Sequence, residues 1–193
     1  VCRIINSTNG KYAVWMADNL NTKKYSDGTD INPNSMYFGT KVQGETARLF
    51  GGTYSWDAVM KINHSPVVDD DMKDFDYSKF GVLDGYEVQG IAPVGWHVPT
   101  VEEWNLLYEV AGGMENGAGI KLKSVDNWLD NGDATVKGKN TLGFNAVGSG
   151  WLWTMSTRDG LVDLYANFKD AYYWTSSFCP GDNSLYKDMG AWS

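Results

Sequence analysis

The sequence predicts a single α+β domain, over residues 1–193, in which short helices pack on short antiparallel strands. Three observations predict this fold class. The chain has 22 Gly among its 193 residues, a composition typical of short strands joined by many turns. One segment carries a complete helix-start signature, and the last third alternates apolar and polar residues as half-buried strands do. A chain of this length can bury its own core, so it needs neither a metal nor a disulfide framework to fold.

A β-hairpin is predicted at the start of the chain. Arg3–Ile5 and Tyr12–Met16 are apolar runs separated by Asn9-Gly10, which tolerates the positive φ angles of a tight turn. Residues 21–50 are polar and rich in Gly, and we expect them to be irregular. A short helix is predicted from about Ser55 to Ile62.

The 55–62 helix places Trp56, Val59 and Met60 on one face. It ends before Pro66, because the residue preceding a proline avoids the helical region. Five aspartates follow: Asp69, Asp70, Asp71, Asp74 and Asp76. We interpret them as a solvated loop. The alternative is a calcium site, since clustered carboxylates suit a hard cation, although the spacing matches no ordered calcium loop.

Residues 100–111 carry the strongest local signal. Thr100 is suited to cap a helix, and Glu103 is placed to bond back to the cap, which together make a capping box. Four apolar residues follow at the spacing of one helix face: Trp104, Leu107, Tyr108 and Ala111. Gly112-Gly113 then ends the helix. A second short helix is predicted over Ala118–Lys123.

From Gly143 onward the pattern changes to strands. The expected strands are Phe144–Val147, Trp151–Trp153, Val162–Phe168 and Tyr172–Ser176. Helices followed by a meander of antiparallel strands are an α+β arrangement.

Charge excludes several classes of partner. The chain has 16 Lys and Arg against 24 Asp and Glu, a net charge of −8 that repels nucleic-acid backbones and anionic lipid. No apolar run approaches the roughly 20 residues that span a bilayer. No basic-then-apolar leader opens the sequence, so we expect any secretion signal to be absent from this chain.

Little in the sequence supports catalysis. Cys2 and Cys179 form either one bridge joining the two ends of the chain or two inert buried thiols. His64 lies in a turn and is expected to be solvated. His97 is expected to be a core histidine bonded to the backbone, and no local signal supports pairing it with Cys179 as a nucleophile. We therefore expect no catalytic residues, no resident metal and no cofactor, with calcium as the one alternative.

Aromatic and short polar residues alternate near the C-terminus. Carbohydrate is bound in this manner, because rings stack on a sugar face while carboxylates and amides bond its hydroxyls. The predicted ligand-binding residues are Trp151, Trp153, Phe178, Asp182, Asn183, Tyr186 and Trp192. Two alternatives hold for the side chains of Phe178, Tyr186 and Trp192: exposure at the surface for binding, or burial in the core. Trp174 is interpreted as a core residue.

Two stretches of the chain carry a family resemblance. They are Trp15–Asn21, and Gln89–Thr100 with Glu103-Trp104 following. Further matching segments occur in the same order: Gly112-Gly113, Lys121–Lys123, Gly143–Ala146 and Tyr173–Ser177. Together they resemble the Fibrobacter succinogenes major paralogous domain family over most of the chain. The Val98–Trp104 stretch is also similar to a helix of the formylglycine-generating enzymes, whose fold is related to C-type lectins.

The resemblance implies a C-type lectin-like domain with two helices, an antiparallel sheet and termini that meet through the first and last strands. It also implies an exported or surface-attached protein of a gut-type bacterium. The chain lacks the cysteine pair of the enzyme relatives and the calcium motifs of sugar-binding lectins. It also ends before the last strand that the family often carries, which implies a truncated or divergent C-terminus.

The function expected from these observations is non-catalytic recognition of a glycan or of a host or partner protein at the cell surface. The alternatives are a structural pilus-tip or lipoprotein domain, a ligand-variable C-type lectin-like receptor and, least favoured, an enzyme.

Overall fold

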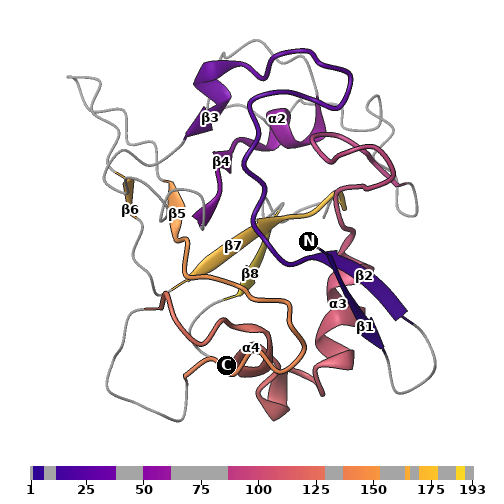
Figure 1. The fold of residues 1–193 in the computed structure, drawn as a ribbon, viewed down its shortest axis with the longest axis vertical. Helices are drawn as coiled ribbons and strands as arrows, with labels where there is room; N and C mark the ends of the chain where they lie inside the picture. The colour runs from indigo at the N-terminus through magenta and orange to yellow at the C-terminus, as the bar shows by residue number, and fades with distance from the viewer. Residues whose placement is uncertain are drawn as a thin grey trace, which may run out of the picture.

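The computed structural model describes residues 2–6, 12–37, 50–61, 87–128, 137–152, 164–165, 170–177 and 186–189, which form a mixed helix-and-strand fold (Figure 1). Its strands pair antiparallel two by two: β1 (Cys2–Asn6) with β2 (Tyr12–Met16), β3 (Met36–Tyr37) with β4 (Thr53–Tyr54), β5 (Trp151–Leu152) with β6 (Leu164–Tyr165), and β7 (Ala171–Trp174) with β8 (Tyr186–Met189). Its helices are η1 (Pro33–Ser35), α2 (Trp56–Met60), α3 (Val101–Val110), η4 (Met114–Asn116) and α4 (Ala118–Leu122). This arrangement is compatible with the predicted α+β class.

The N-terminal hairpin is confirmed. Cys2 lies opposite Met16 and Asn6 lies opposite Tyr12, so the two apolar runs pair along their whole length. The predicted Asn9-Gly10 turn lies outside the described residues. The hairpin lies beside α3 (Figure 1), and α3 contacts β1.

Two short elements interrupt the region that the sequence predicts to be irregular. Pro33 begins η1, and the side chain of Asn32 accepts a hydrogen bond from the N–H of Asn34. The strand β3 then pairs with β4, and the N–H of Ser55 donates to the carbonyl of Ser35 over 2.9 Å. A strand of two residues depends on its partner, so local sequence does not reveal it.

The helix predicted over 55–62 is confirmed as the shorter α2. Its end is set by Lys61, whose left-handed backbone (φ 56°) stops the helix before Pro66. Val59 and Met60 are buried as expected, and Trp56 is half-buried against the same cluster. His64 and the segment Asp69–Asp76 lie outside the described residues.

The predicted capping box of α3 is present. The N–H of Glu103 donates to Thr100 Oγ1 over 3.2 Å, and the N–H of Thr100 donates to Glu103 Oε2 over 2.8 Å. The four residues predicted to face the core are buried: Trp104, Leu107, Tyr108 and Ala111. Gly112 and Gly113 take positive φ angles and end the helix, and the second predicted helix is confirmed as α4.

The predicted strands of the last third are confirmed in part. The strands β5, β6 and β7 fall at or near their predicted positions, although each is short. The predicted strand Phe144–Val147 is wrong, because this segment makes only one bridge, between Ala146 and Lys123. Asn145 has a left-handed backbone (φ 64°), and its N–H donates to the side chain of Asn140 over 2.8 Å. That local bond holds a conformation that a strand cannot contain.

The strand β7 separates two core clusters. The first cluster gathers α3, α4 and Phe144, and the second gathers α2, Ile31, Tyr54, Ile91 and Val98. Ala171 and Tyr173 pack in the first cluster, whereas Trp174 packs against the second. Successive side chains of a strand point to opposite faces, so one short strand can serve both cores. In Figure 1, β7 and β8 cross between α2 and α4.

Candidate functional site

The end of β7 is joined to the start of α3 by three hydrogen bonds. The N–H of Ser176 donates to the carbonyl of Pro99 over 2.9 Å, and the Ser176 hydroxyl donates to the carbonyl of Val98 over 3.0 Å. The N–H of Val101 donates to Ser177 Oγ over 3.0 Å. These bonds bring the aromatic residues of β7 to the segment that precedes α3.

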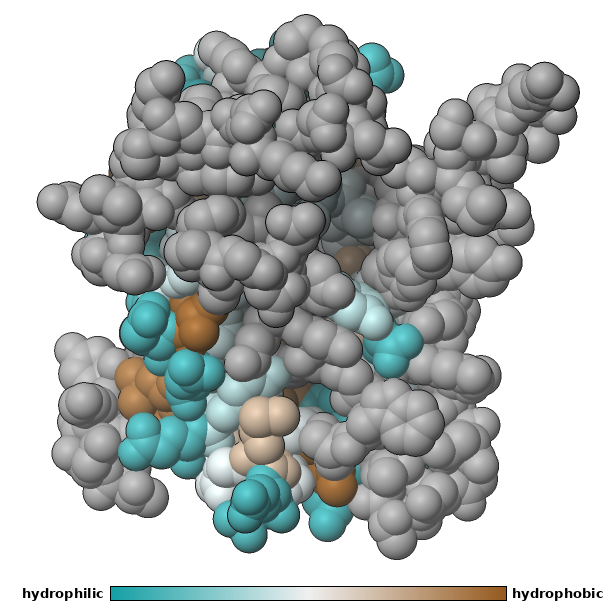
Figure 2. Space-filling view, turned by 180° about the vertical axis from the view of Figure 1, so that it is seen from behind, coloured by the Kyte–Doolittle hydropathy of each residue, from teal (hydrophilic) through white to brown (hydrophobic). Residues whose placement is uncertain are grey.

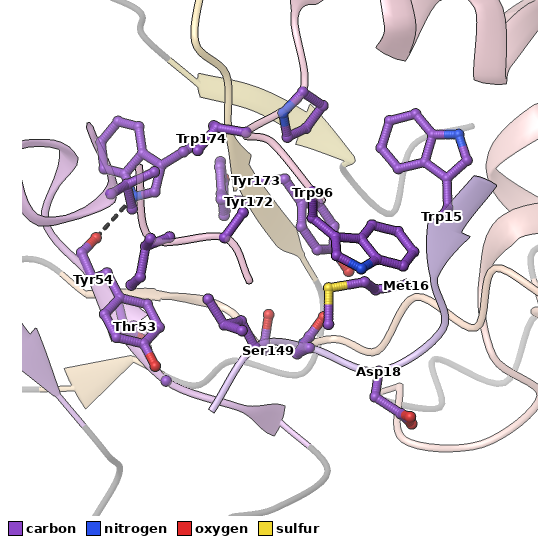
Figure 3. Close-up of a pocket in the computed structure, with 18 of the residues that line it drawn as sticks. Trp15, Met16, Asp18, Thr53, Tyr54, Trp96, Ser149, Tyr172, Tyr173 and Trp174 are labelled. Atoms are coloured by element: carbon purple, nitrogen blue, oxygen red, sulfur yellow. Dashed lines mark hydrogen bonds between the residues drawn. The ribbon is translucent and has the colours of Figure 1, made fainter. Parts of the chain in front are cut away.

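A cavity of about 1350 Å³ lies beside this junction. Its walls come mainly from β2 with the residues that follow it, η1, β4, β7, the segment 91–99 and the start of α3, and Ser149 and Gly150 also line it. Nine described aromatic residues line it: Phe50, Trp104 and Phe144, and the six that Figure 3 labels, Trp15, Tyr54, Trp96, Tyr172, Tyr173 and Trp174. Figure 3 shows these six around the space, with Asp18 and Ser149 on the same side as Met16. We call this space the aromatic cavity.

One wall of the aromatic cavity is a packed cluster of rings. The ring centres of Trp15 and Trp104 are 4.8 Å apart, and those of Trp104 and Tyr173 are 5.2 Å apart. Phe144 makes edge contacts with both tryptophans and with Tyr173. Offset and edge contacts of this kind stabilise the rings and hold their positions.

Two polar groups of this cluster are buried without a hydrogen-bond partner among the described residues. They are the indole N–H groups of Trp15 and Trp104. Burial, with a contribution from Tyr108, raises the pKa of Tyr173 well above its ordinary value. A buried donor without a partner costs about 1–3 kcal/mol, so an acceptor oxygen that reached these groups would be stabilised.

The opposite wall is held by hydrogen bonds. The indole N–H of Trp174 donates to the carbonyl of Tyr54 over 2.7 Å (Figure 3). The Tyr54 hydroxyl donates to the carbonyl of Thr22 over 2.8 Å and accepts the N–H of Thr22 over 2.7 Å. Trp174 therefore has two environments: it packs against the second core cluster, as expected, and it also lines the cavity.

His97 differs from its expected role. Its side chain is 28% exposed, and Nε2 lies 2.7 Å from Glu103 Oε1 rather than on a backbone group. The reason is the capping box, which turns the Glu103 carboxylate back over the start of α3, where His97 lies. Glu87 Oε2 lies 4.0 Å from the other ring nitrogen of His97. Both His97 and Glu103 line the cavity.

The structure describes only two of the predicted ligand-binding residues, and only by their backbone. Trp151 directly follows Ser149 and Gly150, which line the aromatic cavity, and Tyr186 lies opposite Trp174 in the β7–β8 pair. The others lie outside the described residues: Trp153, Phe178, Asp182, Asn183 and Trp192. Cys179 also lies outside them, so the alternatives for the cysteines stay open.

Sequence reasoning missed the rings that line the cavity, Trp96 above all. Trp96 lies in a turn between Pro93 and Pro99. Its backbone N–H donates to the carbonyl of Pro93 over 3.0 Å. A large ring on a tight turn has no helix or strand of its own to bury it. That feature of the sequence could have identified Trp96 as a candidate lining residue. The approach of β7 to this turn could not be read from local sequence.

The described residues form neither a metal-ligand cluster nor a membrane-spanning helix. Among the residues that the structure describes, no group of three or more His, Cys, Asp or Glu is placed to hold a metal ion. Within those same ranges, every helix is too short or too polar to cross a bilayer.

Comparison with known proteins gives one match. No curated protein and no solved structure matches this chain. The family model of the Fibrobacter succinogenes major domain matches residues 11–186, a span that contains β2, α3, β7 and every residue named above as lining the aromatic cavity. The chain therefore belongs to the Fibrobacter succinogenes major domain family.

Proposed function

We propose that this domain is a non-catalytic recognition module that binds a carbohydrate in the aromatic cavity. The observation that carries the proposal is the composition of the cavity wall. Trp96, Tyr172 and Trp174 offer ring faces, while Asn19, Asn34 and Ser149 offer short polar groups beside them. Sugars have apolar faces that stack on rings and hydroxyls that bond such polar groups.

The dimensions of the cavity favour more than one sugar unit. Pockets for drug-sized ligands measure about 300–1,000 Å³, and this cavity of about 1350 Å³ exceeds that range. An oligosaccharide fills such a space better than a monosaccharide. Trp174 and the Trp104 cluster are already held in place, so little side-chain conformational entropy is lost on binding.

A C-type lectin-like architecture is part of the proposal. It is supported by the capped helix α3, the short antiparallel pairs and the junction between Ser176 and Pro99. We also place the module outside the cell or at the cell surface, as the resemblance to exported proteins of gut-type bacteria implies. Neither the fold nor the cellular location identifies the ligand, so the proposed ligand class depends on the composition of the cavity.

A protein partner is less favoured by the described surface. Large apolar side chains are exposed singly: Val14, Val94, Met114 and Val125. Figure 2 shows the face opposite to that of Figure 1, and on its described part the hydrophobic areas are small and separate among hydrophilic ones. Protein-binding faces more often carry one contiguous apolar patch of several hundred Å².

The test is a glycan array followed by calorimetric titration of the glycans that bind. Trp96→Ala is expected to weaken binding of those glycans about fivefold or more, because a stacked ring contributes at least about 1 kcal/mol. Its melting temperature should change by only a few degrees, since Trp96 is half-buried on a turn and lies outside both core clusters.

Trp128→Ala is the matched control. Trp128 is half-buried, does not line the cavity, and its indole N–H donates to the carbonyl of Ala146 over 3.0 Å. This variant should lose stability and keep its affinity. A domain that binds no glycan, or a Trp96→Ala variant that binds as the parent does, would contradict the proposed function.

A further inference from the structure

The aromatic cavity has an unusual distribution of charge. Asp18 and Glu103 contribute carboxylates to its wall, and His97 is the other titratable side chain there besides the tyrosines. Among the described residues that line it, none is Lys or Arg. The whole chain adds a net charge of −8.

The two carboxylates differ in what surrounds them. Glu103 is held by the N–H of Thr100 at 2.8 Å and by His97 at 2.7 Å, so both of its oxygens are engaged. Asp18 is exposed, and Figure 3 shows its carboxylate pointing away from the rings. Asp18 and the net charge of the chain therefore contribute negative potential at this wall of the cavity.

Resting on the proposed function, we infer that the aromatic cavity selects uncharged glycans and rejects those that carry carboxylates or sulfates. Acidic sugars are usually held by Arg or Lys, whose donors pair with the anion. The described wall offers no such partner and places carboxylates there instead. A uronic acid in this space would lose its hydration without gaining a cationic partner among the described lining residues, whereas a neutral hexose loses only hydroxyl hydration to groups that can replace it.

Amine-bearing glycans are the competing class, since rings and carboxylates together also attract cations. The geometry favours neutral sugars because Glu103 is already engaged by His97 and the helix start, and Asp18 lies away from the rings. Of the two described lining carboxylates, Glu103 is engaged and Asp18 points away from the rings. A cationic sugar therefore gains little beyond what a neutral one gains.

The experiment compares glycans with matched linkages on the whole chain. β-1,4-Mannohexaose is paired with the β-1,4-mannuronate hexamer, and cellohexaose with the β-1,4-glucosamine hexamer, alongside a general glycan array. Binding is followed by tryptophan fluorescence, because four described tryptophans line the cavity: Trp15, Trp96, Trp104 and Trp174. Neutral glycans should bind at least about tenfold more tightly than uronates at low salt.

Salt gives a second readout. Raising the salt from about 10 mM to about 1 M shortens the screening length from about 30 Å to about 3 Å. The preference for neutral glycans should shrink accordingly, and it should not shrink if steric exclusion causes it. A persistent preference at high salt would overturn the electrostatic argument.

A charge-reversal variant tests the residue involved. Asp18→Lys should raise the affinity for the mannuronate hexamer about tenfold at low salt, relative to any change in its affinity for mannohexaose. Asp126→Lys makes the same change of charge at an exposed residue outside the cavity and should alter neither affinity by more than about twofold.

The outcomes separate the two proposals. If no glycan binds, the proposed function fails and this inference fails with it. If glycans bind but uronates bind as tightly as neutral ones, or if the glucosamine hexamer binds more than about tenfold tighter than cellohexaose, only the charge selectivity is overturned.

Discussion

Glu103 connects the helix start to the candidate site at the scale of single residues. One carboxylate oxygen accepts the N–H of Thr100, and the other lies 2.7 Å from His97. The sequence predicts the first contact, because capping-box spacing is local. It does not predict the second, since His97 precedes the helix and its position depends on the path of the turn that leads into it.

The first prediction concerns Thr100. Thr100→Ala removes the hydroxyl that accepts the N–H of Glu103 and should lower the free energy of unfolding by about 1 kcal/mol. Chemical denaturation of both proteins measures the difference. Thr100→Ser keeps the hydroxyl and should lie within a few tenths of a kcal/mol of the parent. Equal losses in the two variants would show that the cap bond is not the cause.

The second prediction concerns alkaline pH. The pKa of Tyr173 is raised by burial above its ordinary value of 10.0, so the folded chain keeps this proton where the unfolded chain releases it. Stability should be constant with respect to this group below about pH 10 and should fall as pH rises above it. Urea unfolding at several pH values from neutral to strongly alkaline measures the fall.

Tyr173→Phe is the matching variant. It should weaken the alkaline loss of stability, although Tyr25 and Tyr54, whose pKa values burial also raises, keep part of it. Near pH 7 the variant should lose no more than about 1 kcal/mol, because the hydroxyl that it removes is held at most by the backbone of Val147. An unchanged pH dependence would mean that Tyr173 titrates alike in both states.

At the scale of elements, the junction of β7 with α3 sets the geometry of the cavity. Local signals predict each element alone: alternation predicts β7, and the capping box predicts α3. Their junction depends on Ser176 and Ser177, whose partners lie more than 70 residues away in the chain. The wrong strand at Phe144–Val147 has a local cause instead, since Asn140 holds Asn145 in a backbone that alternation cannot reveal.

The third prediction tests this junction. Ser177→Ala leaves the N–H of Val101 without its side-chain acceptor and should cost about 1 kcal/mol. It should also loosen the wall that carries Trp174, so glycan affinity should fall with stability. Ser149→Ala, at a half-buried residue of the cavity wall, should leave stability within about 0.5 kcal/mol. A Ser177→Ala variant as stable as the parent would show that solvent replaces the bond.

At the scale of the whole molecule, two core clusters stabilise the fold. They meet at β7, and Trp104, Leu107 and Leu122 are almost fully buried in the first of them. Apolar burial contributes about 25 cal/mol per Å², which makes clusters of this kind the main source of stability. With cores of this kind, we expect the fold to need no metal ion.

The fourth prediction is that the domain folds without metal. Adding a chelator should leave the melting temperature unchanged within about a degree. If the fold bound a metal ion, removing that ion would lower the melting temperature, because a ligand of the folded state stabilises it by mass action. A fall of several degrees, abolished in an Asp70→Asn variant, would instead place a calcium ion at the Asp69–Asp76 segment, which lies outside the described residues.

The sequence alone determined the local elements and the family. The hairpin, α2, α3 with its cap, and α4 depend on turn residues, capping and apolar spacing, which act over a few residues. Only the tertiary structure decided the candidate site, because its rings come from β2, β4, the turn before α3 and β7. These segments meet through hydrogen bonds such as Trp174 to Tyr54, between residues 120 positions apart, and no local pattern encodes such a meeting.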